Sequence, residues 1–237
     1  MASEAYAQSV ESVLEALRTS ERGLSGQEAA RRLEEDGPNT LPEKRPDSRL
    51  RLFARQFQSP LIYVLAAAAL GVWATGSAAD AGIIFFILVF NALVGAIQEG
   101  RAQETLRALK KFAETQAVVV RDDPDHAGAA EFVIRDRDVV SGDILILQEG
   151  AKVPADARII AAHNLKVDEA SLTGESVSVG KTADALHGDR AISDQKNMVF
   201  KGTHIAAGNG RAVAVATGAR TYIGALATRI GSAESEI

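Results

Sequence analysis

The sequence lacks cysteine and has only a small excess of negative charge. Without cysteine, its 237 residues can form no disulfide scaffold, thiol nucleophile or thiolate metal site. A formal net charge of −5 argues against a nucleic-acid-binding protein, because such proteins usually carry a basic face. The first residues also lack the basic and then apolar pattern of a secretory signal, so we expect no cleavage there. Hydrophobic residues make up 46% of the chain, which is typical of a protein that buries a core.

Charged residues are missing from two long stretches. Residues 56–79 form an uncharged run of 24 residues, and residues 81–98 form a second run of 18. As helices they would span roughly 36 and 27 Å, close to the ~30 Å of a bilayer core. Because residues 75–80, where the two runs meet, are small and polar, the pattern predicts two transmembrane helices joined by a tight turn, with spans of about 57–76 and 80–98. The alternative is a buried hairpin in a soluble core, but the chain has too little other apolar mass to cover both helices.

Basic residues flank this hairpin and are absent from its turn. Arg49, Arg51 and Arg55 precede the first run, and the second run is followed by Arg101, Arg107, Lys110 and Lys111. Basic flanks belong on the cytoplasmic side, so both termini are expected there. The sequence therefore predicts an integral membrane protein, which we expect in the plasma (inner) membrane.

The residues before the hairpin have the pattern of two short helices between positions 9 and 37. Ser25 followed by Glu28 is a capping box, which marks the start of the second helix. Gly37 and Pro38 mark its end, since glycine supplies a left-handed cap and proline stops the helix. We therefore expect a helical N-terminal segment at 1–48 and the transmembrane hairpin, with cytoplasmic helix extensions, at 49–112.

Short apolar runs separated by turn signals follow the hairpin and predict a mostly-β domain at 113–231. A strand pair at Met198–Ala207 and Gly210–Thr217 is expected, with a hairpin turn at Gly208-Asn209-Gly210. Residues Thr221 to Ile230 are expected to form a closing helix. The short strands favour a distorted barrel or jelly roll. The predicted fold class is therefore an α+β membrane protein. Five further runs are the other strand candidates: 117–120, 132–134, 144–147, 157–160 and 165–167.

One stretch, Asp168 to Ser176, follows a strand candidate and places a carboxylate beside a glycine. A carboxylate on such a loop can orient a water molecule or accept a proton from it. Residue chemistry alone favours a solvated, exposed turn over a catalytic one. The run GESVSVGKT at 174–182 has the wrong glycine spacing for a phosphate-binding loop, and the histidines have no metal-ligand spacing. No cofactor or metal is therefore assigned to this chain.

Thr173-Gly174-Glu175-Ser176 resembles the signature loop of the actuator domain of P-type cation-transporting ATPases, and the chain looks like the N-terminal portion of a type II, calcium-pump-like member. Further motifs agree in order, and the resemblance extends from about Val10 to Ile230. Two positions depart from the family pattern: Ser178 stands where proline is usual, and Ala151 where aspartate is usual. The supporting motifs are Gly142-Asp143-Ile144, Val153-Pro154-Ala155-Asp156, Asn197–Thr203, Ala216-Thr217-Gly218, Asn91-Ala92 with Gln98-Glu99, and Gly23-Leu24-Ser25 with Gly37–Pro42.

The resemblance implies a role in an ATP-driven pump that forms an aspartyl phosphate and then hydrolyses it. Glu175 would position and activate the attacking water, Thr173 and Gly174 would shape the loop against the phosphate, and Ser176 would support it. The first two membrane helices would transmit actuator rotation to the ion path. The implied partners are the lipid bilayer, the transported cation, and the phosphorylation, nucleotide-binding and later membrane regions, with no nucleic acid.

The chain has no Asp-Lys-Thr-Gly-Thr run, which the family uses for phosphorylation. ATP and Mg²⁺ are thus expected for the complete pump and not for this chain, which we expect to be inactive in isolation. The alternative is a stand-alone, non-enzymatic membrane module or a truncated gene product. The downstream reading frame distinguishes these hypotheses.

Overall fold

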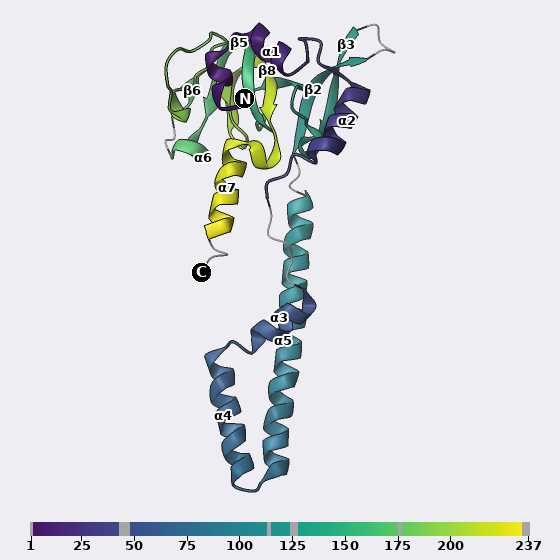
Figure 1. Ribbon diagram of the computed structural model, residues 1–237, viewed down its shortest axis with the longest axis vertical. Coiled ribbons are helices and arrows are strands. Elements are labelled where there is room, and N and C mark those ends of the chain that lie inside the picture. Colours follow the sequence, from purple (N-terminus) through teal and green to yellow (C-terminus); the bar gives the residue numbers. More distant parts are fainter. Residues whose placement is uncertain (1, 43–47, 113–114, 124–127, 175–176, 234–237) are drawn as a thin grey trace. The chain divides into compact units, whose positions relative to one another are not determined.

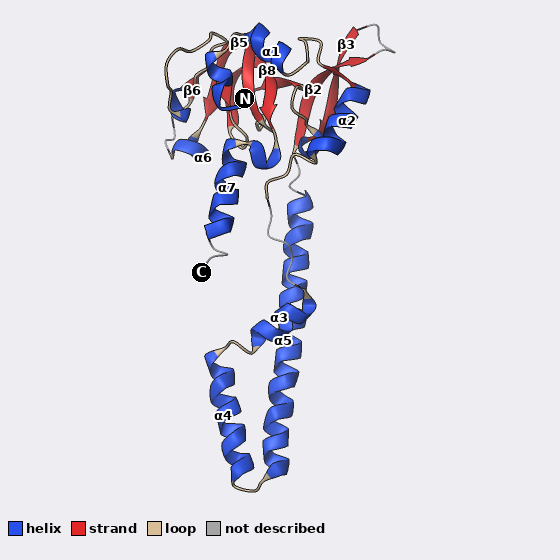
Figure 2. Ribbon diagram, viewed as in Figure 1, coloured by secondary structure: helices blue, strands red, loops and turns tan. Residues whose placement is uncertain are grey.

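The structure, a computed structural model, describes residues 2–42, 48–112, 115–123, 128–174 and 177–233. It divides into two compact units, one formed by residues 1–43 with 114–237 and the other by residues 44–113. The first unit carries the strands, and the second is helical (Figures 1 and 2).

The first unit begins with three helical elements: the 3₁₀ helix η1 (Ala2–Ala7), α1 (Val10–Ala16) and α2 (Gly26–Asp36). The Ser25 hydroxyl accepts a hydrogen bond from the Glu28 N–H at 3.2 Å, so α2 begins where the capping pattern predicts. Gly37, with φ of 77°, ends α2 by donating its N–H to the Leu33 carbonyl. The two helices expected between residues 9 and 37 are therefore confirmed.

A mixed sheet follows, in which eight described strands are paired in the order β1-β2-β4-β8-β5-β6, with β3 on β2 and β7 on β5. Only the β1–β2 pair is parallel among the pairs of described strands. The predicted mostly-β domain is confirmed, and the distorted jelly roll stays a prediction. The strands are β1 (Leu24–Ser25), β2 (Gln116–Asp123), β3 (Gly128–Arg135), β4 (Ile144–Gln148), β5 (Asp156–Asp168), β6 (Val179–Gly180), β7 (Met198–Val199) and β8 (His204–Ala216).

Both faces of the sheet are buried, as alternate residues of β8 show. Ala212 and Ala214 join one apolar cluster with Leu145 and Ile159. Val213, between them, joins a second cluster that includes Tyr6 of η1 and side chains of α1. The N-terminal helices therefore cover one face of the sheet and form part of the same unit. Short helical elements connect or follow the strands: η3 (Asp136–Asp138), α6 (Ala170–Thr173), η4 (Ile192–Asp194), η5 (Gly218–Arg220) and α7 (Tyr222–Ala233).

The expected hairpin at Gly208-Asn209-Gly210 is wrong, because β8 runs through these residues as one strand. Asn209 pairs with His163 of β5, whereas the next pair along the strands is Ala207 with Lys166, so the register shifts at this point. Gly208 has φ of 75°, and a Cβ there would lie 2.3 Å from the Asn164 carbonyl oxygen. Glycine is therefore required for a bulge and a close backbone approach, and not for a turn.

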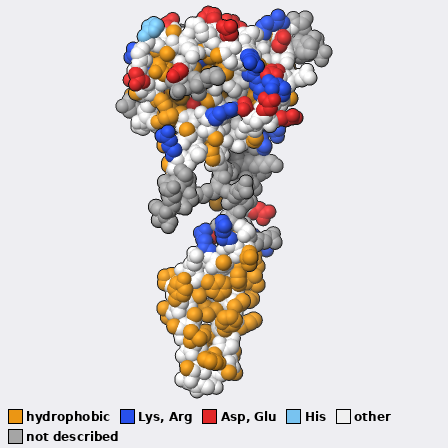
Figure 3. All heavy atoms as spheres, in the orientation of Figure 1, with side chains coloured by type: hydrophobic (Ala, Val, Ile, Leu, Met, Phe, Trp, Pro, Cys, Tyr) orange, Lys and Arg blue, Asp and Glu red, His pale blue; other side chains and the backbone are white. Residues whose placement is uncertain are grey.

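The second unit contains α3 (Arg49–Gln56), α4 (Pro60–Ala74) and α5 (Ala78–Phe112). Figure 1 shows α4 and α5 side by side, joined by a short turn. Large hydrophobic side chains cover their surface (Figure 3); Trp73 and Phe86, for example, are 65% and 67% exposed. Among the described residues, one helix, over Ala78–Leu106, is long and apolar enough to cross a membrane.

The first expected span, 57–76, is shorter in the structure. Helix α3 ends at Gln56, and α4 begins only at Pro60, because proline lacks an N–H and fits the first helical position. The 15 residues of α4 would extend roughly 22 Å, less than the ~30 Å of a bilayer core. Helix α5 is longer than its expected span and runs past residue 98 to Phe112. The two-helix transmembrane hairpin therefore stays a prediction.

Candidate functional site

The candidate loop, residues 169–178, connects β5 to β6. Val167 pairs with Val179, and Lys166 pairs with Gly180, in antiparallel register. The Lys181 N–H also donates to the Leu165 carbonyl at 2.9 Å. Both stems of the loop are consequently held side by side at the sheet.

The first half of the loop is a single helical turn, α6. The Glu169 carbonyl accepts hydrogen bonds from the N–H groups of Leu172 and Thr173 at 2.8 and 3.0 Å. The Thr173 hydroxyl donates to the same carbonyl at 3.2 Å. Gly174 ends the turn in the left-handed conformation, with φ of 76°, and donates its N–H to the Ala170 carbonyl. A Cβ at Gly174 would meet nothing within 4 Å, so backbone conformation alone accounts for the glycine.

Two of the four predicted site residues, Thr173 and Gly174, thus lie together at the end of α6. Glu175 and Ser176 lie outside the described residues. Their roles stay predictions.

Behind the loop, a buried ion pair joins its two stems. The Lys181 amino group lies 2.6 Å from Oε1 of Glu169, and the two side chains are 0% and 2% exposed. Burial raises the pKa of Glu169 and lowers the pKa of Lys181, because desolvation disfavours both charged forms. The second carboxylate oxygen of Glu169 is buried without a hydrogen-bond partner among the described residues. The pair fixes the loop at the cost of desolvating two charges.

Sequence reasoning missed this pair. Glu169 and Lys181 were visible, within Asp168–Ser176 and within the run GESVSVGKT, but each was read only as part of its own motif. Their opposite charges, each on the residue that follows one of two paired strands, are the signal that connects them.

Residues 111–231 match the family model described as the P-type ATPase actuator domain, and residues 5–70 match the model described as the N-terminus of cation transporters and ATPases. The chain belongs to the P-type ATPase family.

Several relatives share this assignment. A probable cation-transporting ATPase F of Mycobacterium tuberculosis is 42% identical over 212 residues, which cover 90% of this chain and 23% of the relative. Calcium-transporting ATPases of Bacillus cereus and Listeria monocytogenes are 38% and 34% identical, over 98% of this chain and 26% of each relative. The chain thus spans about a quarter of the length of the curated relatives it matches.

Two other motifs of the actuator domain have structural roles. The Asp143 carboxylate is fully buried and accepts hydrogen bonds from Arg121 Nε at 2.9 Å and Nη2 at 2.8 Å, and from the Val140 N–H at 2.9 Å. Asp156 accepts from the N–H groups of Lys201 and Tyr222 at 2.9 and 2.6 Å. These aspartates therefore fix turns that support the actuator sheet and the start of α7.

An open groove of about 560 Å³ lies beside the signature loop of the actuator domain. Thr173 and Leu172 line it from α6, and Asp194 and Tyr222 line it from η4 and α7. The described end of the loop therefore borders an open polar surface and is not packed into the core.

Proposed function

We propose that this chain works in an ATP-driven cation pump, where its Thr-Gly-Glu-Ser loop promotes hydrolysis of the aspartyl-phosphate intermediate and couples that step to ion gating. The observation that carries the proposal is the placement of Thr173 and Gly174. They end a turn whose two stems are fixed by strand pairing and by the Glu169–Lys181 ion pair. Glu175 follows directly on this fixed turn, in a domain that belongs to the actuator family.

The proposed chemistry needs a group that binds and deprotonates water. The Glu175 carboxylate would accept a proton from the attacking water as its oxygen bonds to phosphorus. The bond between phosphorus and the aspartate oxygen breaks, and the aspartate leaves as a carboxylate. Thr173 and Gly174 would shape the loop against the phosphate, and Ser176 would support it. The phosphorylated aspartate belongs to a part of the pump outside this chain.

The proposed organisation comprises an N-terminal segment at 1–48, a transmembrane hairpin at 49–112 and the actuator domain at 113–231. The exposed apolar side chains of α4 and α5 support lipid contact, and the arginines before them support a cytoplasmic location for both termini. We place the hairpin, with spans at about 57–76 and 80–98, in the plasma membrane. Actuator rotation would act on the ion path through it.

The proposed partners are the bilayer, the phosphorylation, nucleotide-binding and later membrane regions, and a cation. Calcium is the cation we favour, because two of the relatives are named calcium-transporting ATPases. ATP and Mg²⁺ would be used by the complete pump, whereas the signature loop itself would act only on the phosphorylated aspartate.

The test is to combine this chain with the remaining regions of a P-type pump and to follow decay of the phosphoenzyme. We expect Glu175→Gln to slow that decay by about 10²- to 10⁴-fold, the usual contribution of a general base. The matched control is Glu149→Gln, which neutralises an exposed carboxylate of the same domain and should leave the decay unchanged.

Two results would contradict the proposal. One is a wild-type combination that forms phosphoenzyme but cannot release its phosphate. The other is a Glu175→Gln combination that dephosphorylates as fast as the wild type.

A further inference from the structure

Lys201, a second buried lysine of the actuator unit, contacts three separate parts of the chain. Its amino group donates to the Pro154 carbonyl at 2.7 Å and lies 3.1 Å from Oδ1 of Asp136. It also lies 3.1 Å from Oδ1 of Asn39 and 3.3 Å from the Asn39 carbonyl oxygen. Lys201 itself is only 8% exposed. Such charge-assisted hydrogen bonds are stronger than neutral ones and hold their partners in fixed positions.

Asn39 extends this arrangement, and every polar group of its side chain is used. Its Nδ2 donates to the carbonyl oxygens of Asp136 and Pro154 at 3.0 and 2.9 Å. Its Oδ1 accepts the Gly218 N–H at 2.8 Å, and its own N–H donates to the Arg137 carbonyl at 2.9 Å. We call Asn39, Asp136, Pro154, Lys201 and Gly218 the Lys201 hub.

The hub lies where the chain leaves and re-enters the actuator unit. Asn39 lies five positions before Lys44, the first residue of the helical unit. On the return side, Thr115 follows the last residue of that unit, Ala113, by two positions, and its hydroxyl donates to Asp136 Oδ2 at 3.0 Å. Both connections between the units therefore begin at residues that the hub holds.

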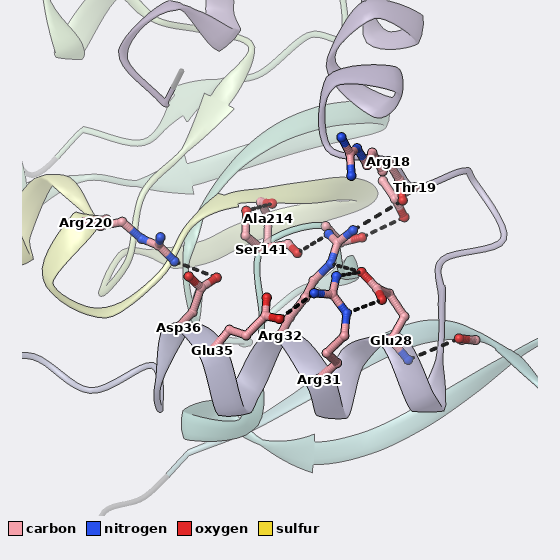
Figure 4. Close-up of polar contacts among 12 residues, drawn as sticks. Arg18, Thr19, Glu28, Arg31, Arg32, Glu35, Asp36, Ser141, Ala214 and Arg220 are labelled. Atoms are coloured by element: carbon pink, nitrogen blue, oxygen red, sulfur yellow. Dashed lines mark hydrogen bonds and ion pairs between the residues drawn. The ribbon is translucent and has the colours of Figure 1, made fainter.

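A third segment is attached at the same place. Gly218 is the first residue of η5, which leads into α7. The Asp156 carboxylate accepts hydrogen bonds from the N–H of Lys201 and from the N–H of Tyr222, the first residue of α7. Arg220 of η5 also forms an ion pair with Asp36 of α2 at 2.8 Å (Figure 4). The hub thus joins the two inter-unit connections to the base of α7.

We propose that the Lys201 hub is the mechanical joint that transmits actuator rotation to the membrane helices, with Lys201 as a positioning residue. This inference rests on the proposed function. A moving domain can pull on a chain connection only if the base of that connection stays fixed to the domain. The Lys201 amino group links the residues at which the connections begin, so a single rotation of the domain moves the connections together. The five hub residues are not part of the signature loop at 169–178, so we expect the hub to act on coupling and not on hydrolysis.

The test measures dephosphorylation and transport in the same complete pump, with Lys201→Met as the variant. We expect phosphoenzyme decay to stay within about twofold of wild type, while ions moved per ATP fall by about threefold or more, the scale of known coupling changes. Lys152→Met is the matched control, since it removes an exposed lysine of the same unit, away from the stems of the signature loop. Lys201→Arg keeps the positive charge of the side chain and should therefore recover part of the lost ions per ATP.

Lys201→Met leaves the Asp136 carboxylate without its cation, and that variant could fail to fold. The double variant Asp136→Asn/Lys201→Met removes both charges together and leaves no unpaired charge. It should fold and show the same loss of ions per ATP. If the hub has only a structural role, the amount of folded pump decreases while the number of ions moved per ATP stays unchanged. That result in either variant overturns the inference. Failure of the proposed function is distinct, because Glu175→Gln would then leave phosphoenzyme decay unchanged.

Discussion

Lys181 and Glu169 face each other across the stems of the signature loop, with 2.6 Å between the amino nitrogen and Oε1. Glu169 is the residue after β5, and Lys181 is the residue after β6. Because both are buried, neither charge can be satisfied by water if its partner is lost. The pair therefore links the stability of the actuator domain to the geometry of its loop.

Lys181→Met should destabilise the actuator unit by about 3–5 kcal/mol, the usual cost of leaving one charge of a buried pair uncompensated. Glu169→Gln/Lys181→Met removes both charges and should recover much of that loss. Denaturant unfolding followed by circular dichroism measures both variants, and the two single changes complete a double-mutant cycle. Additive effects of the single changes would contradict a direct interaction.

Acid should weaken the side-chain hydrogen bonds within α2. Hydrogen bonds from Arg31 and Arg32 lower the pKa of Glu28 from 4.5 to about 2 (Figure 4). A carboxylate whose pKa is lower in the folded state stabilises the fold fully above its unfolded pKa. That contribution is lost as pH falls from about 4.5 through about 2. We expect Glu28→Gln to lower the melting temperature at pH 6 and to match the wild type near pH 2, as measured by thermal unfolding at several pH values. If the difference in melting temperature between Glu28→Gln and the wild type stays constant with pH, the Glu28 carboxylate does not stabilise α2 through its charge.

Local patterns predicted the elements well where local chemistry decides them. Ser25 and Gly37 fix the ends of α2 by hydrogen bonds within a few residues, so its bounds were readable from the sequence. The turn at 208–210 failed because Gly208 lies close to the backbone of Asn164, and Gly210 close to that of Ala161. Both contacts span more than forty residues, and no local pattern encodes them. Helix α4 is shorter than the uncharged run that contains it, because absence of charge does not reveal where Pro60 starts a helix.

The candidate site was found through resemblance, and its supporting residues were not. Thr173 and Gly174 could be assigned because their motif is contiguous in the sequence. The Glu169–Lys181 pair and the Lys201 hub depend on strand pairing and on contacts over 12 to 179 positions. Such contacts follow from the tertiary fold, so composition and spacing could not predict them.

Arg158 should anchor the N-terminal residues to the sheet. Its fully buried guanidinium donates to the carbonyl oxygens of Ala5, Gln8 and Ala183 at 3.1, 3.2 and 2.9 Å. Desolvation lowers its pKa to about 10. Arg158→Met removes these three hydrogen bonds and should destabilise the unit by about 2–3 kcal/mol. Amide hydrogen exchange in residues 5–8 should rise as well.

The matched control for Arg158 is Arg22→Met, which breaks an exposed ion pair with Asp122 whose side chains are 61% and 48% exposed. That change should alter stability by no more than about 1 kcal/mol. Equal exchange in residues 5–8 for the Arg158 variant and the control would contradict the anchoring role.

Gly208→Ala should be much more damaging than Gly188→Ala. Both glycines have positive φ, of 75° and 79°, so both variants strain the backbone by about 1–2 kcal/mol. At Gly208 the added Cβ would also lie 2.3 Å from the Asn164 carbonyl oxygen, whereas at Gly188 it meets nothing within 4 Å. Denaturant unfolding of the two variants measures the difference. Similar losses at both positions would show that the bulge tolerates a side chain.

The proposed membrane topology predicts opposite labelling of two engineered cysteines. Because the chain has no native cysteine, Ser77→Cys and Ala129→Cys each provide a single thiol. Ser77 lies in the turn between α4 and α5, and Ala129 lies on an exposed position of β3. In intact cells a membrane-impermeant maleimide should label position 77 and leave position 129 unlabelled until the membrane is permeabilised. Labelling at position 129 but not at position 77 would show that the hairpin has the opposite orientation in the membrane. Labelling of both positions only after permeabilisation would contradict a hairpin that crosses the membrane.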